Sequence, residues 1–361
     1  MDDIFRIDST KLHFHPHRVA QLLDGRDDWE RAKEIYPIYV EVSPVSVCNH
    51  ACTFCGIDYV IEAAKDSSAS MKMLDSSVFG ERVHEMATLG IKSVMFAGEG
   101  EPLLHKHIND MVEHTVASGI DVSFTTNGTL LHKLDDLDRC TWIKVSLNAG
   151  TRETYSKVHR TGEKDWTTVW ANLRAAAKRK GRCTLGVQMV LLPENEHEAP
   201  QLQTLCDDAG VDYLVLKPYS QHASSITHEY EGWKTKLQTV EVKPWQGLQP
   251  KPGTSVVLRE ESINTTEIPY DKCHATPYLW AYLMASGDLY SCSAYLLDDR
   301  FRLGNINDQT FRDIWHGERR RANWEYVRKQ LDIKECRLNC RMDKANRYLD
   351  QFGKQLHINF I

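Results

Sequence analysis

Between residues 36 and 216, short runs rich in β-branched and aromatic residues alternate with segments of helical periodicity. Phe79, Val83 and Met86 recur at helical spacing behind Asp75 and before Gly90, which predicts a capped amphipathic helix. Strands that alternate with helices form parallel sheets, so the order predicts an α/β fold with an open or closed barrel. The expected strands are 36–42, 91–97, 121–125, 142–147, 184–192 and 211–216, and the further helices are about 105–118, 165–180 and 198–209.

The rhythm of strands and helices stops after Tyr219, which divides the chain into unlike parts. A length of 361 residues with 42% hydrophobic residues is typical of two globular domains and excludes a disordered chain. A helix is expected around 309–329 in the last part. The expected organisation is an N-terminal extension at 1–35, a core barrel at 36–221, a polar and turn-rich linker at 222–264, and a smaller second domain at 265–361.

Charge and hydropathy argue against two classes of partner. Lys and Arg total 44 against 50 Asp and Glu, giving a net charge of −6 with both signs interspersed, which argues against a nucleic-acid binder. No apolar run approaches the roughly 20 residues of a membrane helix. The first residues, MDDIFRIDST, are acidic and polar, unlike a signal peptide. We expect a cytoplasmic protein with no membrane or nucleic-acid partner.

The ten cysteines are the strongest indication of chemistry. In a chain without an export signal, metal binding or redox use is expected before disulfides. Cys140, Cys183 and Cys206 stand alone in apolar or helical surroundings and are predicted to be buried structural residues. The other seven form two groups: Cys48, Cys52 and Cys55 near the start, and Cys273, Cys292, Cys336 and Cys340 near the end.

The first group follows directly on the first predicted strand, at the strand end where α/β sheets carry their chemistry. Cys48, Cys52 and Cys55 have the spacing C-x3-C-x2-C. Three thiolates can ligate three irons of a [4Fe–4S] cubane and leave the fourth iron open to a substrate or cofactor. A structural zinc site with His50 as a further ligand is the alternative.

These residues resemble the radical S-adenosylmethionine (SAM) superfamily. The C-x3-C-x2-C spacing with Phe54 before the third cysteine is one shared feature, and the segment Gly98-Glu99-Gly100-Glu101-Pro102 resembles the family's Gly-Gly-Glu-Pro motif, with Glu99 in place of the first glycine. The resemblance implies a partial (β/α)6 TIM-like barrel and a SAM site. The residues it implies at that site are Phe54, Gly98, Glu99, Gly100, Glu101, Pro102, Thr126, Asn127, Ser146, Asn148 and Gln188.

The second group of cysteines also carries a resemblance. Thirteen residues separate Cys273 from Gly287, and four more precede Cys292, which resembles the opening of the SPASM and twitch auxiliary-cluster domains. Cys336 and Cys340 then complete four ligands, so the resemblance implies one fully ligated auxiliary [4Fe–4S] cluster in a shortened domain. A zinc ribbon is the alternative here, because a hairpin with its turn at Ser286-Gly287 would bring Cys273 and Cys292 together for either metal.

The resemblance implies an enzyme that cleaves SAM to a 5′-deoxyadenosyl radical, which then abstracts hydrogen from the substrate. An external one-electron reductant of flavodoxin or ferredoxin type would be its partner. The net reaction is an oxidation or an epimerisation. An epimerisation needs a hydrogen donor such as a thiol, and Cys140, Cys183 or Cys206 would have to reach the cavity.

We expect a small polar substrate, sugar-like or cyclitol-like. Only 47 residues precede Cys48, too few for the peptide-recognition domain of many peptide-modifying relatives. Lys217 and Tyr219 are the expected substrate contacts, with Gln221 and His222 beside them, and such groups suit hydroxyls. The alternatives are a maturase that modifies a peptide or protein side chain and a non-catalytic metal-binding scaffold.

Overall fold

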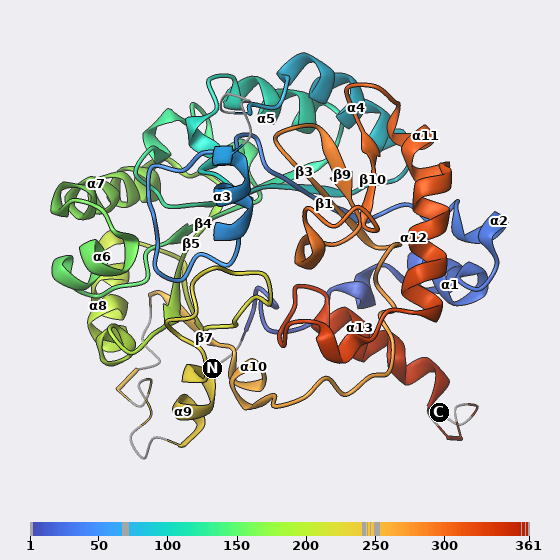
Figure 1. Cartoon of the computed structure of the whole chain (residues 1–361). Coiled ribbons are helices and arrows are strands. Elements are labelled where there is room, and N and C mark those ends of the chain that lie inside the picture. The colour runs from blue at the N-terminus through green and yellow to red at the C-terminus, as the bar shows by residue number, and fades with distance from the viewer. Residues whose placement is uncertain are drawn as a thin grey trace.

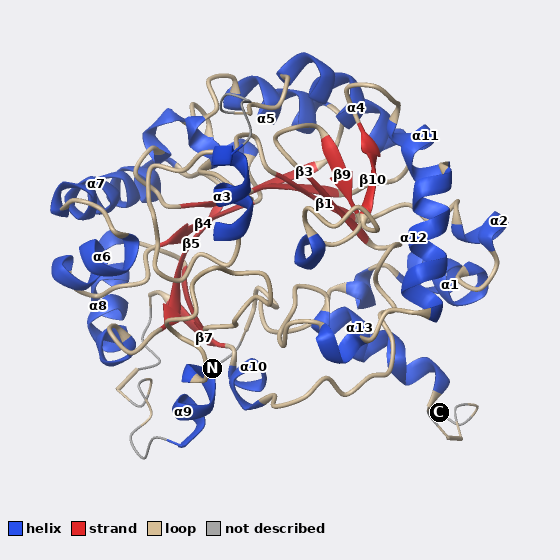
Figure 2. Ribbon diagram, in the orientation of Figure 1, coloured by secondary structure: helices blue, strands red, loops and turns tan. Residues whose placement is uncertain are grey.

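A single ten-stranded sheet organises the chain, in the order β10-β9-β8-β1-β2-β3-β4-β5-β6-β7. Figures 1 and 2 show its strands along an arc with helices around the outside. The structure is a computed structural model that describes residues 3–66, 72–239, 243, 245, 247, 248, 253–354, 356, 357 and 359. No helix among these residues has both the length and the apolar character needed to cross a membrane.

All six predicted strands form, and each is parallel to its neighbour in the sequence. Their consecutive pairing is the arrangement of a partial TIM-like barrel, as predicted. Their bounds are β1 Tyr39–Val42, β2 Ser93–Phe96, β3 Asp121–Thr126, β4 Trp142–Ser146, β5 Thr184–Leu191 and β6 Tyr213–Pro218.

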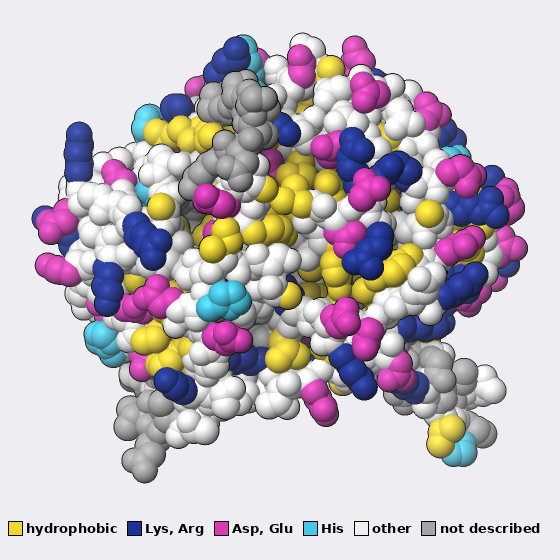
Figure 3. Space-filling view, viewed as in Figure 1, with side chains coloured by type: hydrophobic (Ala, Val, Ile, Leu, Met, Phe, Trp, Pro, Cys, Tyr) yellow, Lys and Arg dark blue, Asp and Glu magenta, His cyan; other side chains and the backbone are white. Residues whose placement is uncertain are grey.

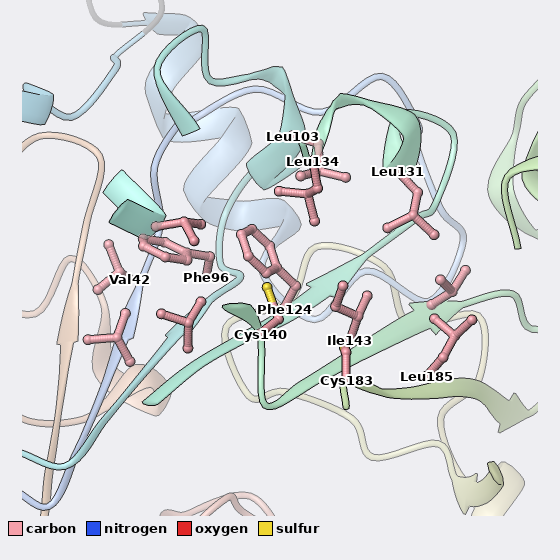
Figure 4. Close-up of a cluster of buried hydrophobic side chains, with 14 of the residues drawn as sticks. Val42, Phe96, Leu103, Phe124, Leu131, Leu134, Cys140, Ile143, Cys183 and Leu185 are labelled. Atoms are coloured by element: carbon pink, nitrogen blue, oxygen red, sulfur yellow. The ribbon is translucent and has the colours of Figure 1, made fainter. Parts of the chain in front are cut away.

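Successive residues of each strand face opposite sides of the sheet. Val42, Phe96, Phe124, Ile143 and Leu185 face the helices and are fully buried (Figure 4). The opposite, inner face carries polar side chains, as on β4, where exposure alternates along the strand. The outer face therefore forms the core, and the inner face is left for a site.

Four of the helices that cover the outer face lie near their predicted bounds, and a fifth, over Arg152–His159, was not predicted. The Asp75 carboxylate caps the helix that carries Phe79, Val83 and Met86, by accepting hydrogen bonds from the backbone amides of Ser77 and Val78. The helices of this layer are α4 Ser76–Thr88, α5 Ile108–Ala117, α6 Arg152–His159, α7 Glu163–Arg179 and α8 Ala199–Ala209, and α3 Asp58–Asp66 follows the first cysteine group.

The expectation of an irregular linker over 222–264 is wrong in part. Strand β7 (Ser255–Leu258) pairs in parallel with β6, and two short helices, α9 (Trp233–Thr239) and α10 (Glu260–Asn264), flank it. The strand was missed because a run of four residues after a polar stretch has little local periodicity. Its pairing with β6, 42 residues away at Tyr213 and Ser255, is what makes it a strand.

The C-terminal part continues the same sheet instead of forming a separate one. Strand β8 (Trp280–Leu283) is parallel to β1, and β9 (Asp288–Tyr290) and β10 (Arg302–Asn305) follow antiparallel. The predicted hairpin turn is present, with Gly287 at a φ of 86°. The helix expected over 309–329 is divided at Gly317 into α11 Phe311–His316 and α12 Glu318–Lys329, and α13 Asp343–Asp350 follows.

The N-terminal residues pack against this C-terminal part. Helices α1 (Pro16–Gly25) and α2 (Trp29–Ala32) contribute Leu22 and Ala32 to a buried cluster that also contains Tyr278 and Trp324. Short 3-10 helices complete the structure: Leu12–Phe14, Pro102–Leu104, Leu131–Lys133, Leu137–Arg139, Glu196–Glu198, Ser293–Tyr295, Ile333–Glu335 and Gln351–Gly353. On the face drawn in Figure 3, charged side chains of both signs are interspersed.

Candidate functional site

The first cysteine group lies in the loop that leaves β1. Cys48, Cys52 and Cys55 are all free thiols. Burial raises the pKa of Cys52, and the neighbouring Cys48 and Cys55 raise it further. Burial likewise raises the pKa of Cys48 to about 11. Because their pKa values are raised, these neighbouring thiols need a bound cation to become thiolates. The set therefore fits the three cysteine ligands of an iron–sulfur cluster.

Glu101 joins the loop after β2 to the turn after β3. Its carboxylate accepts hydrogen bonds from the Thr126 hydroxyl at 2.6 Å, the Asn127 amide at 2.8 Å and the Leu103 amide at 3.2 Å. The carboxylate, which the sequence analysis placed in the SAM site, is thus occupied in holding the Thr126-Asn127 turn. Pro102 begins the short helix that follows. Glu101 is a positioning residue in this arrangement.

Hydrogen bonds also join the turn after β3 to the cysteine loop. The Asn127 side-chain amide donates to Asn49 Oδ1 at 2.7 Å, and the Asn49 amide donates to Thr129 Oγ1 at 2.9 Å. A side-chain hydrogen bond from Asn127 also lowers the pKa of Cys48, against the larger effect of burial. Hydrogen bonds therefore bring the cysteine loop and the motifs after β2 and β3 together.

The glycines of the motif after β2 are required by the cysteine loop. A Cβ on Gly100 would lie 2.2 Å from the Val47 carbonyl oxygen, and Gly98 has a φ of 114°, which only glycine adopts readily. Between them, Glu99 turns toward the C-terminal part and accepts a hydrogen bond from the Ala285 amide at 3.0 Å. The Glu99 carboxylate thus contacts the β8–β9 turn, and its expected place in the SAM site stays a prediction.

His159, at the end of α6, was missed by the sequence analysis. Its Nδ1 lies 3.2 Å from Cys52 Sγ, and its Nε2 donates to the Leu147 carbonyl at 2.8 Å. Burial and then the neighbouring His50 lower the pKa of His159 to about 3, so the ring is neutral. It lies 107 residues from Cys52 in the sequence, and no local pattern joins the two.

His50, the candidate zinc ligand, lies in the same place. Ligand atoms of His50, Cys52 and His159 are all within 4.8 Å of one another. The His50 Nε2 lies 3.2 Å from an Asp165 carboxylate oxygen. Phe54 packs edge-on against His159, with ring centroids 5.5 Å apart. His50 and His159 thus lie beside the sulfur of Cys52, and Phe54 packs against His159.

Of the residues expected to contact SAM after β4 and on β5, Asn148 is placed differently from Ser146 and Gln188. Asn148 is fully buried with a φ of 56°, and its Oδ1 accepts from the Val190 amide at 2.8 Å. It therefore joins β4 to β5, and its expected contact with the cofactor stays a prediction. Gln188 lies opposite Ser146 on the neighbouring strand, both on the inner face, so these two side chains remain available to a ligand.

The two expected substrate contacts, Lys217 and Tyr219, also differ from each other in their placement. Lys217 is half-buried on the inner face of β6. Tyr219 is buried, packs against Tyr230 with ring centroids 5.3 Å apart, and donates its hydroxyl to Gln221 Oε1 at 3.0 Å. His222 is buried and stacked on Tyr59. Only Lys217 of this set presents its functional group to the inner face.

The second cysteine group comes from three segments: the loop before β8, the residues just after β9, and the segment that precedes α13. All four thiols are free. Burial raises the pKa of Cys340 to about 12, and Cys273 and Cys336 raise it further. The four members, Cys273, Cys292, Cys336 and Cys340, provide as many sulfurs as a fully ligated cubane needs.

Side chains around the second group support the sulfurs. The Asn346 amide donates to Cys273 Sγ at 3.6 Å, and the Tyr295 hydroxyl lies 3.2 Å from Cys336 Sγ. Ile57 and Tyr59, which follow Cys55 directly, pack in the same hydrophobic cluster as Cys273 and Cys292. The two cysteine groups are therefore linked through the first turn of α3.

The three lone cysteines are buried in the core, as predicted. Cys140, Cys183 and Cys206 are at most 2% exposed and belong to the cluster between the sheet and its outer helices. Figure 4 shows Cys140 and Cys183 among the side chains of that cluster. Burial raises the pKa of Cys183 to about 12. They lie away from the inner face, so none of the three is placed to donate hydrogen to a substrate there.

Comparison with known proteins gives matches to both parts of the chain. Residues 42–206 match the radical SAM superfamily, and residues 273–341 match the SPASM iron–sulfur cluster-binding domain. A probable GTP 3′,8-cyclase of Metallosphaera sedula is 33% identical over 184 residues, which are 49% of this chain and 54% of that protein. The chain thus spans about half the length of this relative.

Other similarities cover more of the chain at lower identity. A PqqA peptide cyclase of Xanthomonas campestris pv. campestris is 21% identical over 297 residues, which are 78% of this chain and 74% of that protein. The structure of Streptococcus suis SuiB bound to S-adenosylmethionine has a TM-score of 0.59 at 14% identity, and covers 89% of this chain and 75% of that one. SuiB bound to its precursor peptide SuiA has a TM-score of 0.57 and covers 88% and 71%.

The radical SAM match spans the strands and motifs around the first cysteine group, and the SPASM match begins at Cys273 and ends just after Cys340. Both agree with the convergence of free thiols in the structure. The cofactors of such proteins are SAM and [4Fe–4S] clusters. This chain therefore carries a radical SAM region over residues 42–206 and a C-terminal SPASM iron–sulfur cluster-binding domain over residues 273–341.

Proposed function

We propose that the protein uses SAM and a [4Fe–4S] cluster on Cys48, Cys52 and Cys55 to remove a hydrogen atom from a substrate held on the inner face of the sheet. The observation that carries this proposal is the convergence of three free thiols at the carboxyl end of β1. Glu101 and Asn127 hold the adjoining motifs beside them. A set of exactly three cysteines leaves one iron open to a cofactor.

When bound, the cluster and SAM supply one-electron cleavage of the sulfonium and a 5′-deoxyadenosyl radical that takes hydrogen from carbon. The chain itself positions the cofactor and the substrate and surrounds the cluster ligands. Gly98 and Gly100 let the backbone after β2 approach the loop after β1 closely. Ser146 and Gln188 offer hydrogen bonds to a ligand on the inner face. His159 lies against the Cys52 sulfur, and Phe54 packs on the His159 ring and holds it there.

We propose a small polar substrate, because the inner face carries hydroxyl, amide and ammonium groups on β4, β5 and β6. A peptide is the second candidate. It is supported by the similarity to a PqqA peptide cyclase over 78% of this chain and by the fold shared with SuiB, which has been solved with a precursor peptide. A flavodoxin-like or ferredoxin-like protein would supply the electron.

For the four C-terminal cysteines we propose one auxiliary [4Fe–4S] cluster with an electron-transfer or structural role. Four thiolates complete a cubane and leave no iron for substrate. The lone cysteines lie in the outer core, so a thiol-based epimerisation has no donor among them. A net two-electron oxidation therefore agrees better with the arrangement than an epimerisation does.

The test is anaerobic reconstitution of the full chain, reduction with dithionite, and quantitation of 5′-deoxyadenosine and iron. We expect product from the native protein and about eight irons per chain. The variant Cys48→Ala/Cys52→Ala/Cys55→Ala should make no 5′-deoxyadenosine and retain about four irons. Cys183→Ala, which removes a core thiol, is the control. A triple variant that still cleaves SAM, or zinc in place of iron throughout, contradicts the proposal.

A further inference from the structure

Two ammonium groups on the inner face of the sheet have no charged partner. Lys144 lies on β4 and Lys217 on β6, at positions whose neighbours along each strand face the buried core. Within the part of the chain that the structure describes, neither Nζ has a hydrogen bond or an ion pair; the Lys144 Nζ lies 5.8 Å from the centroid of the Trp142 ring. A buried lysine without a partner is costly as a cation, and a bound anion would offset that cost.

Guanidinium groups approach the same region from the C-terminal part. Arg341 is paired with Glu41 of β1 at 2.9 Å, and Arg259, which follows β7, is paired with Asp8 at 3.1 Å. Arg337 has no carboxylate partner among the described residues and donates instead to the Ser220 carbonyl at 3.0 Å. Glu41 already pairs with Arg341, although its charge also acts on Lys144 and Lys217. Among the described residues, Lys144, Lys217 and Arg337 form no ion pair with a carboxylate.

These cations lie close enough to shift one another's pKa values. Burial, followed by the charges of Arg341 and Arg259, lowers the pKa of Lys144 to about 7. Burial also lowers the pKa of Lys217, followed by Lys144 and by Arg259, Arg337 and Arg341. Lys144 and Lys217 nonetheless keep part of their surface exposed. Both side chains are therefore surrounded by protein and still reached by water.

Arg337 lies between the two cysteine groups and so locates these cations relative to them. It immediately follows Cys336, and its Nη1 would lie 3.8 Å from a Cβ on Gly56, the residue after Cys55. Ser220, which it contacts, follows β6 and Lys217. A ligand held by Arg337 and Lys217 would therefore lie within the interior, next to the loop that carries the first cysteine group.

From this geometry we propose that the substrate carries an anionic oxygen group, a carboxylate or a phosphate, that binds to Lys144, Lys217 and Arg337. Buried like charges repel, and an anion among them removes the repulsion and forms charge-assisted hydrogen bonds. The proposal rests on the proposed function, since it assigns the chemical class of the substrate of that same site. Phosphate and carboxylate share this chemistry, and the experiment separates them.

The test measures binding of inorganic phosphate and, separately, of malonate to the reconstituted full chain at saturating SAM by calorimetry. Lys144→Met and Lys217→Met keep the length of the side chain and remove its charge. Lys178→Met, at an exposed position on α7, is the matched control. We expect one of the two anions to bind to the native protein and to the control, and at least tenfold more weakly to either inner-face variant. The anion that binds identifies the group.

Thermal unfolding separates a binding role from a structural one. Without an anion, Lys144→Met and Lys217→Met should unfold at a higher temperature than the native protein, because the substitution removes buried repulsion. The anion should raise the unfolding temperature of the native protein and not that of the variants. A lower unfolding temperature in both variants, with anion binding unchanged, overturns the proposal.

Two further outcomes contradict the proposed anion site for the substrate. If SAM itself binds tenfold more weakly to both variants, the cations hold the carboxylate of the cofactor. If neither anion binds to the native protein, there is no anion site. Formation of 5′-deoxyadenosine, measured on the same samples without substrate, reports the proposed function separately, so either idea can fail while the other stands.

Discussion

At the scale of single residues, Glu99 shows how one substitution in a motif changes what the motif contacts. The carboxyl is 3% exposed, and only its Oε1 has a partner, the Ala285 amide; its Oε2 is buried without one in the described structure. Burial raises the pKa of Glu99 from 4.5 to about 7, although the Ala285 hydrogen bond opposes the shift. The side chain thus connects the loop after β2 to the C-terminal part and is protonated near neutral pH.

Glu99 predicts a pH dependence of stability. As pH rises from about 4.5 to about 7, the unfolded chain releases a proton that the folded protein keeps, so the free energy of unfolding falls over this window. Glu99→Gln should remove this contribution, which amounts to at most about 3 kcal/mol. The check is urea unfolding at pH 5 and pH 7.5.

Exposed Glu81→Gln serves as the control, since its side chain is 72% exposed. We expect the loss of stability between the two pH values to be smaller in Glu99→Gln than in the native protein and in the control. Equal pH dependence in all three proteins would show that Glu99 is ionised in the folded state.

At the scale of elements, Glu101 assembles the loops at the carboxyl ends of β1, β2 and β3. Its carboxylate accepts three hydrogen bonds, two of them from the Thr126-Asn127 turn, and Asn127 continues the connection to Asn49 in the cysteine loop. Short strands end in loops that have no regular hydrogen bonding of their own. One buried carboxylate therefore fixes the relative positions of two motifs.

Replacing Glu101 should weaken the site without removing a ligand. Glu101→Ala is expected to lower SAM affinity or the rate of 5′-deoxyadenosine formation by about 10-fold to 100-fold, the range seen when groups that orient metal ligands are lost. Glu113→Ala, in the exposed part of α5, should leave both unchanged. Equilibrium dialysis with SAM and product assays measure these effects. A Glu101→Ala protein with native SAM affinity and rate would show that the turn holds its position without the carboxylate.

At the scale of the whole molecule, the two matched regions share one sheet. Strand β8 pairs with β1 over four residues, and Leu283, Leu289, Phe311 and Trp315 belong to the same buried cluster as the barrel core. The N-terminal residues join them, since the Trp315 indole donates to the Ile35 carbonyl at 2.9 Å. The C-terminal part is therefore a structural component of the barrel as well as a site for a second cluster.

This sharing predicts that the barrel does not fold without the C-terminal part. A chain that ends at residue 264 would leave β1 as an unpaired edge and expose apolar core surface. We expect it to aggregate or to lack cooperative thermal unfolding, whereas the full chain should be monodisperse and unfold cooperatively. Size-exclusion chromatography and circular dichroism are the measurements. A soluble, cooperatively folded fragment would show that β8 adds little to the stability of the barrel.

The sequence alone determined the six strands β1 to β6, the cap at Asp75, the burial of the lone cysteines and the two cysteine groups. Each of these follows from local pattern: alternation, helical spacing, capping and the distance between cysteines. Periodicity indicates that one face of an element is buried, and close spacing in the chain ensures that Cys48, Cys52 and Cys55 lie together.

Only the tertiary structure decided which surfaces meet. The pairing of β8 with β1, the strand β7, the contact of His159 with Cys52 and the gathering of Lys144, Lys217 and Arg337 all join residues far apart in the sequence. Asn148 and Glu99 stand at expected motif positions, and their side chains accept hydrogen bonds from a neighbouring strand and a turn. Local periodicity carries no information about the partner that covers a face, so these contacts depend on how the whole chain packs.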